Sequence, residues 1–264
     1  MDIGILYICT GKYKIFWESF YKSCEKYFLP SHNKHYFVFT DATELNFGNN
    51  VTLIKEQPKG FPMDSLLRFK MFNSIYEHLE KFDYLFFFIS NMCIVDFINE
   101  DILPDKKNDG LVALIHPGYY NKKAQYYPFE RNPKSKAFIP FLSPKKYFYY
   151  MGSFNGGESK AFLKLIKQLD SNVNEDLNNG IIAIYHDESH LNSYLNFKNT
   201  KGVDPSYGFP EGSNIPFQPK ILILNKVKHG GGYFNKLPKS DMIARLKLKI
   251  NIIKNALLWK FISQ

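Results

Sequence analysis

Residues 83–88 read Asp-Tyr-Leu-Phe-Phe-Phe, an almost wholly apolar run. A strand that is apolar at consecutive positions must be covered by protein on both faces, so this run predicts a buried strand of a largely parallel sheet. Apolar runs at residues 3–8 and 36–41 precede it, and helical patterns over residues 16–28 and 65–79 lie between the runs. The order strand, helix, strand, helix, strand is typical of an open α/β sheet. We therefore expect an α/β fold with a Rossmann-like, mostly parallel central sheet flanked by helices.

The second half of the chain alternates less regularly. Residues 116–140 are rich in Pro, Asn, Lys and Tyr and predict a long ordered loop, and residues 147–157 combine strand-forming aromatic residues with glycines. We expect a helix over residues 161–169, a short apolar strand over residues 181–184 and a late strand over residues 220–224. The sequence has no internal repeat and no linker rich in Pro or Ser, so a single domain followed by a tail is expected.

The composition is that of a globular protein with a basic surplus. Hydrophobic residues make up 45% of the 264 residues, and the formal net charge is +9. The 17% of aromatic residues suits a carbohydrate-binding cleft, and it equally suits the codon usage of an AT-rich genome. A basic balance alone favours a nucleic acid, an anionic membrane or a phosphorylated substrate as partner. The chain carries no nucleic-acid recognition motif, so we expect no nucleic-acid partner.

Targeting signals and cysteines suggest where the protein works. Residues 1–7 contain Asp2 and no basic residue, so they predict a strand and not a signal peptide. No stretch reaches the roughly 18 uncharged apolar residues of a membrane span. Cys9, Cys24 and Cys93 form no C-x-x-C pair, so neither a zinc site nor a disulfide framework follows. We expect a cytoplasmic protein in a reducing compartment, at most peripheral to the inner face of the membrane.

The C-terminal residues 239–264 have a composition of their own. They carry six Lys or Arg residues against Asp241 alone, and apolar residues recur between the cations at steps of three or four: Ile243, Leu246, Ile250, Ile253, Leu257 and Phe261. This pattern predicts a basic amphipathic helix suited to peripheral contact with an anionic membrane. The alternative is a helix that packs on the catalytic domain or on a second subunit, and the sequence leaves the oligomeric state open.

Residues 185–192 read Tyr-His-Asp-Glu-Ser-His-Leu-Asn and place many polar groups directly after the predicted strand 181–184. A surface loop would carry such residues too. Polar residues that follow strands of an α/β sheet, however, lie at the ligand crevice. A carboxylate held there suits an oxocarbenium-like transition state, either by stabilising its charge or by attacking the anomeric carbon.

This octapeptide resembles the Trp-His-Asp-Glu-Ser-His-Leu-Asn motif of glycosyltransferase family 6, which contains the histo-blood-group A and B transferases, the α-1,3-galactosyltransferases and bacterial relatives. Further segments agree with the family in order: residues 36–41, 116–120, 129–131, 137–140 and 149–157. The resemblance covers roughly residues 3–232. It implies a GT-A-type single domain over residues 1–238, with residues 239–264 as a tail. It also implies a retaining α-1,3-transfer of galactose or N-acetylgalactosamine from a UDP-sugar to a galactose-terminated, often fucosylated, glycan.

The resemblance assigns roles residue by residue. Glu188 matches the catalytic carboxylate, which acts either as a covalent nucleophile or by stabilising an ion pair in a front-face reaction. The positions that match the acceptor site are His116, Phe129, Glu130, Tyr185 and Glu188, with Tyr185 in place of a stacking Trp. The positions that match the donor site are Ile8, Cys9, Thr10, Tyr13, Arg68, Ser90, Asn91, Met151, Gly152, Ser153, His186, Asp187, Lys226, Lys228 and His229. Without the resemblance, Arg68 would be read as an exposed helix cation and residues 226–232 as a mobile basic loop.

The chain departs from the animal members of the family after Phe88. Where those members have a manganese-binding Asp-x-Asp, this chain has Ile89-Ser90-Asn91. Isoleucine has no ligand atom, and a neutral amide is a weak partner for a divalent ion, so we expect no metal cofactor. Lys226 and Lys228 would then stabilise the diphosphate.

Two questions stay open at this stage. Met151 resembles galactose-specific members, while Ser153 either crowds an acetamido group or hydrogen-bonds it, which favours galactose slightly. The loss of Asp-x-Asp also allows a different class of protein, a non-catalytic binder of UDP-sugar or glycan with the same fold.

Overall fold

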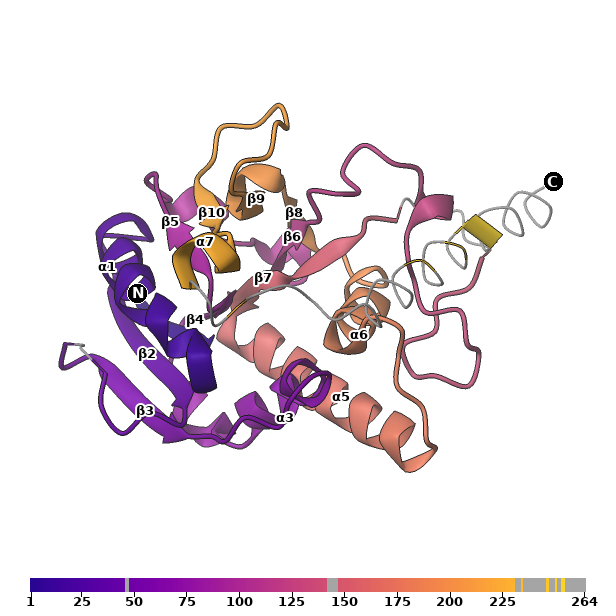
Figure 1. Cartoon of the computed structure of the whole chain (residues 1–264), viewed down its shortest axis with the longest axis horizontal. Coiled ribbons are helices and arrows are strands. Elements are labelled where there is room, and N and C mark those ends of the chain that lie inside the picture. The colour runs from indigo at the N-terminus through magenta and orange to yellow at the C-terminus, as the bar shows by residue number, and fades with distance from the viewer. Residues whose placement is uncertain are drawn as a thin grey trace.

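The computed structural model describes residues 1–45, 48–141 and 147–230, together with Phe234, Leu246, Ile250, Ile253 and Lys254. A seven-stranded sheet in the order β3-β2-β1-β4-β7-β6-β8 forms its centre (Figure 1). The bounds are Asp2–Ile8 for β1, Asn33–Thr40 for β2, Val51–Lys55 for β3, Tyr84–Ile89 for β4, Leu111–Ile115 for β6, Tyr150–Glu158 for β7 and Lys201–Val203 for β8. Pairing is antiparallel only on the two sides of β7 and parallel elsewhere in this sheet. The predicted mostly parallel sheet is confirmed.

A small second sheet brings residues 221–223 next to residues 92–94, which follow β4 of the main sheet. It has the order β5-β10-β9, with bounds Met92–Ile94, Ile221–Ile223 and Phe209–Pro210. Directly after β10, the Leu224 N–H donates to the Asn91 carbonyl at 2.8 Å. Because Asn91 lies in the turn between β4 and β5, this contact places the segment that begins at Lys226 beside the carboxyl end of β4.

Helices cover both faces of the main sheet. Helix α1 packs on one face, and α3, α5 and α6 pack on the other (Figure 1). The helices are α1 Trp17–Tyr27, α2 Met63–Leu66, α3 Arg68–Asn73, α4 Tyr76–Leu79, α5 Ser159–Asn178, α6 His186–Leu195 and α7 Lys226–Gly230. Short 3-10 segments are η1 Gly11–Phe16, η2 Glu100–Ile102, η3 Lys106–Asn108, η4 Ala124–Tyr126 and η5 Pro205–Gly208.

Strand β4 shows why the run at residues 83–88 is apolar throughout. The Phe88 ring meets the Phe20 ring of α1 at 5.2 Å between centroids, on one face of the sheet. On the other face the Phe87 ring meets the Phe72 ring of α3 at 5.3 Å. Successive side chains of a strand point to opposite faces, so both faces of β4 need apolar residues to exclude water. Aromatic rings thus form the core on both sides, as the run predicts.

Two predicted elements are wrong. The helix expected over residues 65–79 is split into α2, α3 and α4; near the second break the Ser74 hydroxyl donates to the Met71 carbonyl at 2.7 Å, a bond that competes with the helical ladder. The strand expected over residues 181–184 is not formed. The Ile181 N–H bonds the Asp176 carbonyl at the end of α5, and the Ile184 N–H bonds a Glu130 carboxylate oxygen at 2.8 Å. A helix end and a side chain therefore satisfy this backbone in place of a neighbouring strand.

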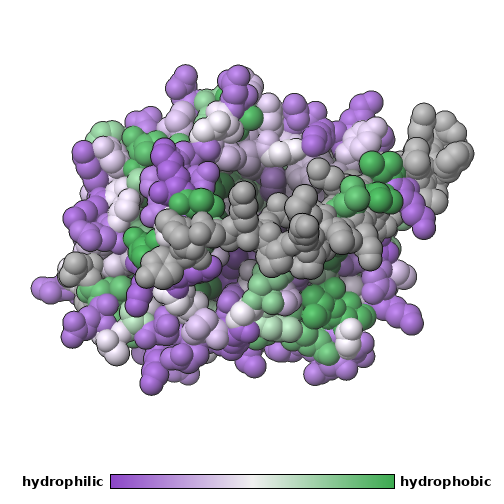
Figure 2. All heavy atoms as spheres, viewed as in Figure 1, coloured by the Kyte–Doolittle hydropathy of each residue, from purple (hydrophilic) through white to green (hydrophobic). Residues whose placement is uncertain are grey.

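Most of the predicted amphipathic tail lies outside the described residues. Leu246, Ile250 and Ile253 are described, are helical and are exposed. Elsewhere on the face seen in Figure 2, hydrophobic side chains form separate groups among hydrophilic ones. Within the described part of the chain, no helix has the length and apolar character needed to cross a bilayer.

Candidate active site

A cavity of about 190 Å³ opens at the carboxyl ends of β1 and β4, where ligands of open α/β sheets bind. Ile8 and Ile89 face each other as the last pair of the two strands, and both line it. Its lining is Ile8, Thr10, Tyr13, Phe61, Asp64, Ser65, Arg68, Phe87, Ile89, Ser90, Asn91 and Lys226. The structure therefore brings together seven of the predicted donor residues from four separate parts of the sequence. We call this cavity the donor cavity after these predicted residues.

The loop after β1 is held in place by the end of β2. The Gly11 N–H donates to the Asp41 carboxylate at 2.6 Å, and Gly11 has φ of 58°, a conformation that glycine adopts without strain. The Thr40 hydroxyl donates to the Cys9 carbonyl at 3.1 Å. The Cys9 side chain itself is fully buried in the core, and burial raises the pKa of its thiol to about 12. Cys9 thus supports the loop from below and does not line the cavity.

The turn after β4 offers little to a metal ion. The Asn91 Nδ2 atom donates to the Leu224 carbonyl at 2.7 Å, while its Oδ1 atom is buried with no hydrogen-bond partner among the described residues. Ile89 contributes no donor atom, and a lone amide oxygen beside the Ser90 hydroxyl does not make a divalent-cation site. In the described part of the chain, no three His, Cys, Asp or Glu residues lie together as metal ligands would. That the protein works without a metal ion remains a prediction.

Arg68 is the first residue of α3 and is only 7% exposed, so its reading as an exposed helix cation is wrong. Its guanidinium forms an ion pair of 3.0 Å with the Asp187 carboxylate and donates to the Gly152 carbonyl. The group also lies over the Phe87 ring, 4.2 Å from its centroid. Burial lowers the pKa of Arg68 and raises that of Asp187, and in each case the charge of the partner opposes this shift. Arg68 thus links the donor cavity to the motif on α6.

Glu188 lies in the first turn of α6, at the centre of this network. Its Oε2 atom accepts the Gly152 N–H and its Oε1 atom accepts the Tyr149 hydroxyl, both at 2.7 Å. Burial outweighs these two bonds and raises the pKa of Glu188 to about 7. A Cβ atom at Gly152 would lie 3.2 Å from an Asp187 oxygen, so glycine allows the two acidic residues to approach the strand. The motif therefore starts a helix that packs on β7. The sequence had suggested that it follows a strand, and this prediction is wrong.

Residues 151–153, which the resemblance links to the choice of donor sugar, are the donor-selecting segment. Its other two members, Met151 and Ser153, lie close to Glu188. Met151 is half-buried against the core, and Ser153 is buried with its hydroxyl unpartnered in the part of the chain that the structure describes. His186 has φ of 50°, and its ring meets the exposed Phe61 ring edge-on at 4.8 Å. Phe61 therefore stands at the entrance of the donor cavity.

Aromatic residues line the predicted acceptor side. The His116 ring lies 5.0 Å from the centre of the Tyr119 ring and 5.7 Å from that of Tyr149, and the Tyr119 hydroxyl interacts electrostatically with that of Tyr185. The His116 Nδ1 atom accepts the Gly118 N–H at 2.9 Å, and burial lowers its pKa to about 4, so the ring is neutral near pH 7. A neutral imidazole keeps Nε2 as a hydrogen-bonding group for a sugar hydroxyl.

Phe129 and Glu130 are placed differently from the other predicted acceptor residues. Phe129 is 2% exposed and packs in an aromatic cluster with Tyr127, Tyr147 and Tyr149. Glu130 uses one carboxylate oxygen to accept from Asn132 N–H and the other to accept from Ile184 N–H, both at 2.8 Å. In this conformation Phe129 packs beneath the acceptor side and Glu130 binds the backbone there. Their contact with an acceptor stays a prediction.

The three predicted cations at the C-terminal end of the domain separate. The Lys226 ammonium reaches the donor cavity, 3.3 Å from the Tyr13 hydroxyl and 4.8 Å from the centre of its ring. Lys228 and His229 instead bind the two oxygens of Glu211, at 2.6 and 2.8 Å. Of the three, only Lys226 thus lines this cavity.

Sequence reasoning missed several residues of the site, among them Phe61, Tyr149 and Asn192. Phe61 was overlooked because aromatic residues are common throughout this chain, and Tyr149 was quoted only as the first residue of a matching segment. Asn192 was quoted only as the end of the motif, although its spacing of four residues from Glu188 puts both side chains on one face of a helix.

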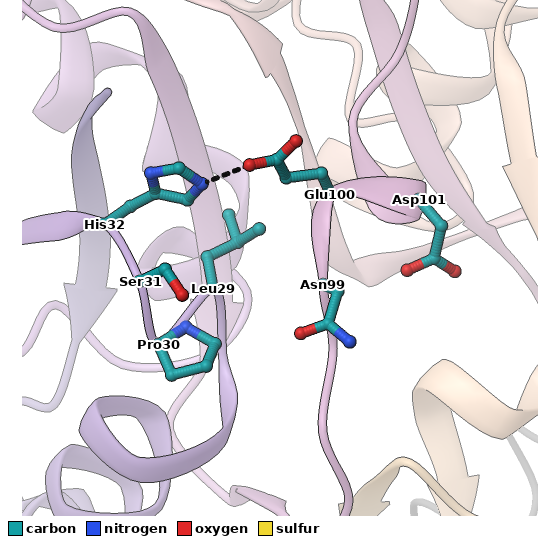
Figure 3. Close-up of a pocket in the computed structure, with 7 residues that line it drawn as sticks. All are labelled: Leu29, Pro30, Ser31, His32, Asn99, Glu100 and Asp101. Atoms are coloured by element: carbon teal, nitrogen blue, oxygen red, sulfur yellow. Dashed lines mark hydrogen bonds and ion pairs between the residues drawn. The ribbon is translucent and has the colours of Figure 1, made fainter.

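A larger cavity of about 460 Å³ lies elsewhere (Figure 3). It is lined by residues 29–32 and 99–101, and its main feature is a 2.8 Å contact between His32 and Glu100. His32 directly precedes β2, so this cavity lies at the amino ends of the parallel strands, opposite the donor cavity. None of the predicted site residues lines it, and we assign it no role in the reaction.

The chain is similar to known proteins over most of its length. A model of glycosyltransferase family 6 matches residues 1–231. The O-antigen biosynthesis glycosyltransferase WbnI of Escherichia coli is 37% identical over 228 residues, which are 86% of this chain and 95% of that protein. Histo-blood group ABO system transferase 2 of Rattus norvegicus is 32% identical over 215 residues, covering 78% and 62% of the two chains. Globoside alpha-1,3-N-acetylgalactosaminyltransferase 1 of Homo sapiens is 30% identical over 233 residues, covering 84% and 65%. The match thus spans less than two thirds of each of these two animal relatives.

Proposed function

The chain belongs to glycosyltransferase family 6 and has its GT-A α/β fold, and from this premise we propose that it transfers galactose or N-acetylgalactosamine from a UDP-sugar to a galactose-terminated glycan, with retention of configuration and an α-1,3 linkage. The observation that carries the proposal is the setting of Glu188. Its carboxylate is held by Gly152 and Tyr149, and Gly152 is held in turn by Arg68, which lines the donor cavity. A buried, oriented carboxylate suits a sugar that develops positive charge at its anomeric carbon.

The uridine and diphosphate would lie at the carboxyl ends of β1 and β4. Ile8, Thr10 and Tyr13 line this cavity, and an apolar and aromatic wall suits a nucleoside base. The Lys226 ammonium lies at the same cavity and can offset the charge of the leaving diphosphate without a metal ion. Lys228 and His229 would join it only after leaving Glu211.

The transferred sugar would lie against Met151–Ser153, next to Glu188. The Ser153 hydroxyl is buried without a partner in the described part of the chain, so a hydroxyl or acetamido group of the donor can satisfy it. The acceptor would approach over His116, Tyr119 and Tyr185, where tyrosine rings offer faces for stacking against a sugar. The E. coli relative is named for O-antigen biosynthesis, which supports a bacterial surface glycan as the acceptor.

The direct test is the variant Glu188→Gln. We expect transfer to fall at least a thousandfold while UDP binding, measured by calorimetry, stays within a few-fold of wild type. The donor is identified by assaying UDP-galactose and UDP-N-acetylgalactosamine on lactose and 2'-fucosyllactose with a strong chelator present. UDP binding with neither transfer nor donor hydrolysis would support the alternative, a non-catalytic binder of UDP-sugar or glycan. Loss of activity in chelator, restored by manganese, would refute the metal-free reading.

We also propose that residues 239–264 hold the enzyme at the inner face of an anionic membrane. Leu246, Ile250 and Ile253 recur at steps of four and three residues, are helical and are exposed, and six cations lie along the same segment. An apolar helix face flanked by Lys and Arg binds at the boundary between lipid headgroups and acyl chains. A protein truncated after residue 238 should no longer sediment with phosphatidylglycerol vesicles and should still turn over lactose. If the truncated protein binds these vesicles as well as the full chain does, the membrane role is wrong; a fall in thermal stability with vesicle binding unchanged would support packing on the domain.

A further inference from the structure

One edge of β7 is bound by side chains of a helix. The Glu188 Oε2 atom accepts the Gly152 N–H, and one helical turn later the Asn192 Oδ1 atom accepts the Tyr150 N–H at 2.9 Å. One further turn along, the Asn196 Oδ1 atom accepts the Phe148 N–H at 3.0 Å. Side chains at every fourth position from 188 to 196, the last directly after α6, therefore bind every second N–H of residues 148–152, and α6 runs antiparallel to β7.

This ladder is possible because the two repeats have nearly the same length. Four helical residues advance about 6.0 Å, and two strand residues advance about 6.6 Å. The pairing of β7 with β4 ends at Phe154 opposite Phe88, so residues 148–152 lie beyond it. The side chains of α6 supply acceptors there, where a buried N–H without a partner would be destabilising.

The central rung is the one in which a side chain binds both backbone groups of a residue of β7. Besides accepting from Tyr150 N–H, the Asn192 amide donates from Nδ2 to the Tyr150 carbonyl at 2.8 Å and to the Glu188 carbonyl at 2.9 Å. Asn192 is 1% exposed, so these bonds have no competition from water. An amide carries both a donor and an acceptor and can imitate a neighbouring strand, which a carboxylate cannot do.

We infer that Asn192 is a positioning residue for Glu188: by binding both backbone groups of Tyr150 and the carbonyl of Glu188, it sets the register of α6 on β7 and with it the place of the Glu188 carboxylate. The two hydrogen-bond donors that hold this carboxylate are Tyr149, directly before β7, and Gly152 on β7, and they flank Tyr150 and Met151. A shift of α6 along β7 would therefore separate the Glu188 carboxylate from both hydrogen-bond donors at once. It would also move this carboxylate away from residues 151–153, the donor-selecting segment. The catalytic meaning of this role rests on the proposed function.

The test compares Asn192→Ala with Asn196→Ala as a matched control. Asn196→Ala also removes a buried amide, one that accepts from the Phe148 N–H just before β7 and donates to the Asn192 carbonyl, but it lies two turns from Glu188. A misplacement of about 1 Å is enough to lower a rate a hundredfold. We expect Asn192→Ala to lower kcat at least tenfold, with KM for the donor and Kd for UDP within threefold of wild type. Asn196→Ala should keep kcat within twofold although its thermal stability also falls. Equal kcat losses in the two variants, or a kcat of Asn192→Ala within twofold of wild type, would overturn the inference. If Asn192→Ala does not fold, the isosteric Asn192→Asp takes its place, with the same expectation, because it keeps the acceptor for Tyr150 and loses the donor.

A second readout does not depend on sugar transfer. The carboxyl carbon of Glu188 can be titrated by NMR in protein labelled with ¹³C-glutamate and assigned by the signal that Glu188→Gln lacks. Because Gly152 and Tyr149 favour the ionised form, we expect the midpoint to rise in Asn192→Ala and to stay in place in Asn196→Ala. If the wild-type chain transferred no sugar at all, the proposed function would fail, and this titration would still decide the role of Asn192: an unchanged midpoint in Asn192→Ala rejects it.

Discussion

The Tyr149 hydroxyl donates a hydrogen bond of 2.7 Å to the Glu188 carboxylate, although the two residues lie 39 positions apart. Tyr149 is buried in the aromatic cluster that also contains Phe129 and Tyr127, so its ring cannot turn away without disturbing the core. Burial also raises the pKa of Tyr149 well above its usual range, so the phenol keeps its proton and remains a donor. This contact connects the packing of the acceptor side with the charge of the proposed catalytic group.

The first prediction concerns the pH dependence of transfer. In the proposed function Glu188 acts as a carboxylate, and burial raises its pKa to about 7, so kcat should rise with pH through about 7 and then level off. The variant Tyr149→Phe removes a bond that favours the anion and should move this rise upward by about one pH unit. Tyr127→Phe is the control, because its hydroxyl donates to the Lys122 carbonyl and not to Glu188. A profile that is the same in Tyr149→Phe and wild type would contradict the role of this contact.

The second prediction concerns stability. The pKa of Glu188 is higher in the folded state than the 4.5 of a free side chain, so the unfolded chain releases this proton first as pH rises. Folding stability is therefore lost between about pH 4.5 and 7, by up to about 3 kcal/mol above that range. Glu188→Gln carries no such penalty, so urea denaturation should show it to be more stable than wild type at pH 8 and nearly equal to it at pH 4.5. Glu18→Gln, a change at an exposed residue of α1, should show no such trend; a Glu188→Gln curve parallel to wild type would count against the buried carboxylate.

The third prediction concerns Lys226. Of Lys226, Lys228 and His229, Lys226 is the residue that already reaches the donor cavity. Lys226→Met should therefore weaken UDP binding by roughly tenfold or more in the presence of chelator, because a charge-assisted hydrogen bond is worth about 1.5–3 kcal/mol. Methionine keeps an unbranched chain over the Tyr13 ring, so the cavity wall is retained. Lys198→Met is the matched control, since Lys198 also lies over a tyrosine ring, that of Tyr194. Calorimetry that finds the same UDP affinity in Lys226→Met and wild type would remove Lys226 from the diphosphate site.

The fourth prediction concerns Glu211, which binds Lys228 and His229 in this conformation. These bonds lower the pKa of Glu211 to about 2, so it is ionised at neutral pH and would compete with a diphosphate for the Lys228 ammonium and the His229 ring. Glu211→Gln keeps a carbonyl oxygen for the Asn225 N–H and removes the charge, so UDP binding should tighten up to about fivefold, as expected for an exposed ion pair. The gain should shrink at high salt. Weaker UDP binding in this variant would mean that Glu211 serves to hold α7 in place.

Much of the fold could be predicted from local patterns. The apolar runs that became β1, β2 and β4 are visible because a strand covered on both faces has no position for polar side chains. The helix over residues 65–79 and the strand over residues 181–184 were wrong because apolar spacing reports burial and says nothing about competing hydrogen bonds. A serine hydroxyl accompanies the break in the first, and a glutamate side chain satisfies the backbone of the second.

The candidate site divides in the same way. The motif at residues 185–192 is enough to single out Glu188 as the candidate catalytic carboxylate, because a family motif consists of consecutive residues. By itself the sequence determined the buried sheet and the chemical types of the site residues, because both are written in residues that are neighbours along the chain. Only the tertiary structure decided that Arg68 is buried against Asp187, that Tyr149 and Asn192 hold Glu188 on β7, and that Lys228 rests on Glu211. Such pairings depend on the register in which distant elements pack, and a register is set by the whole core and not by any one segment.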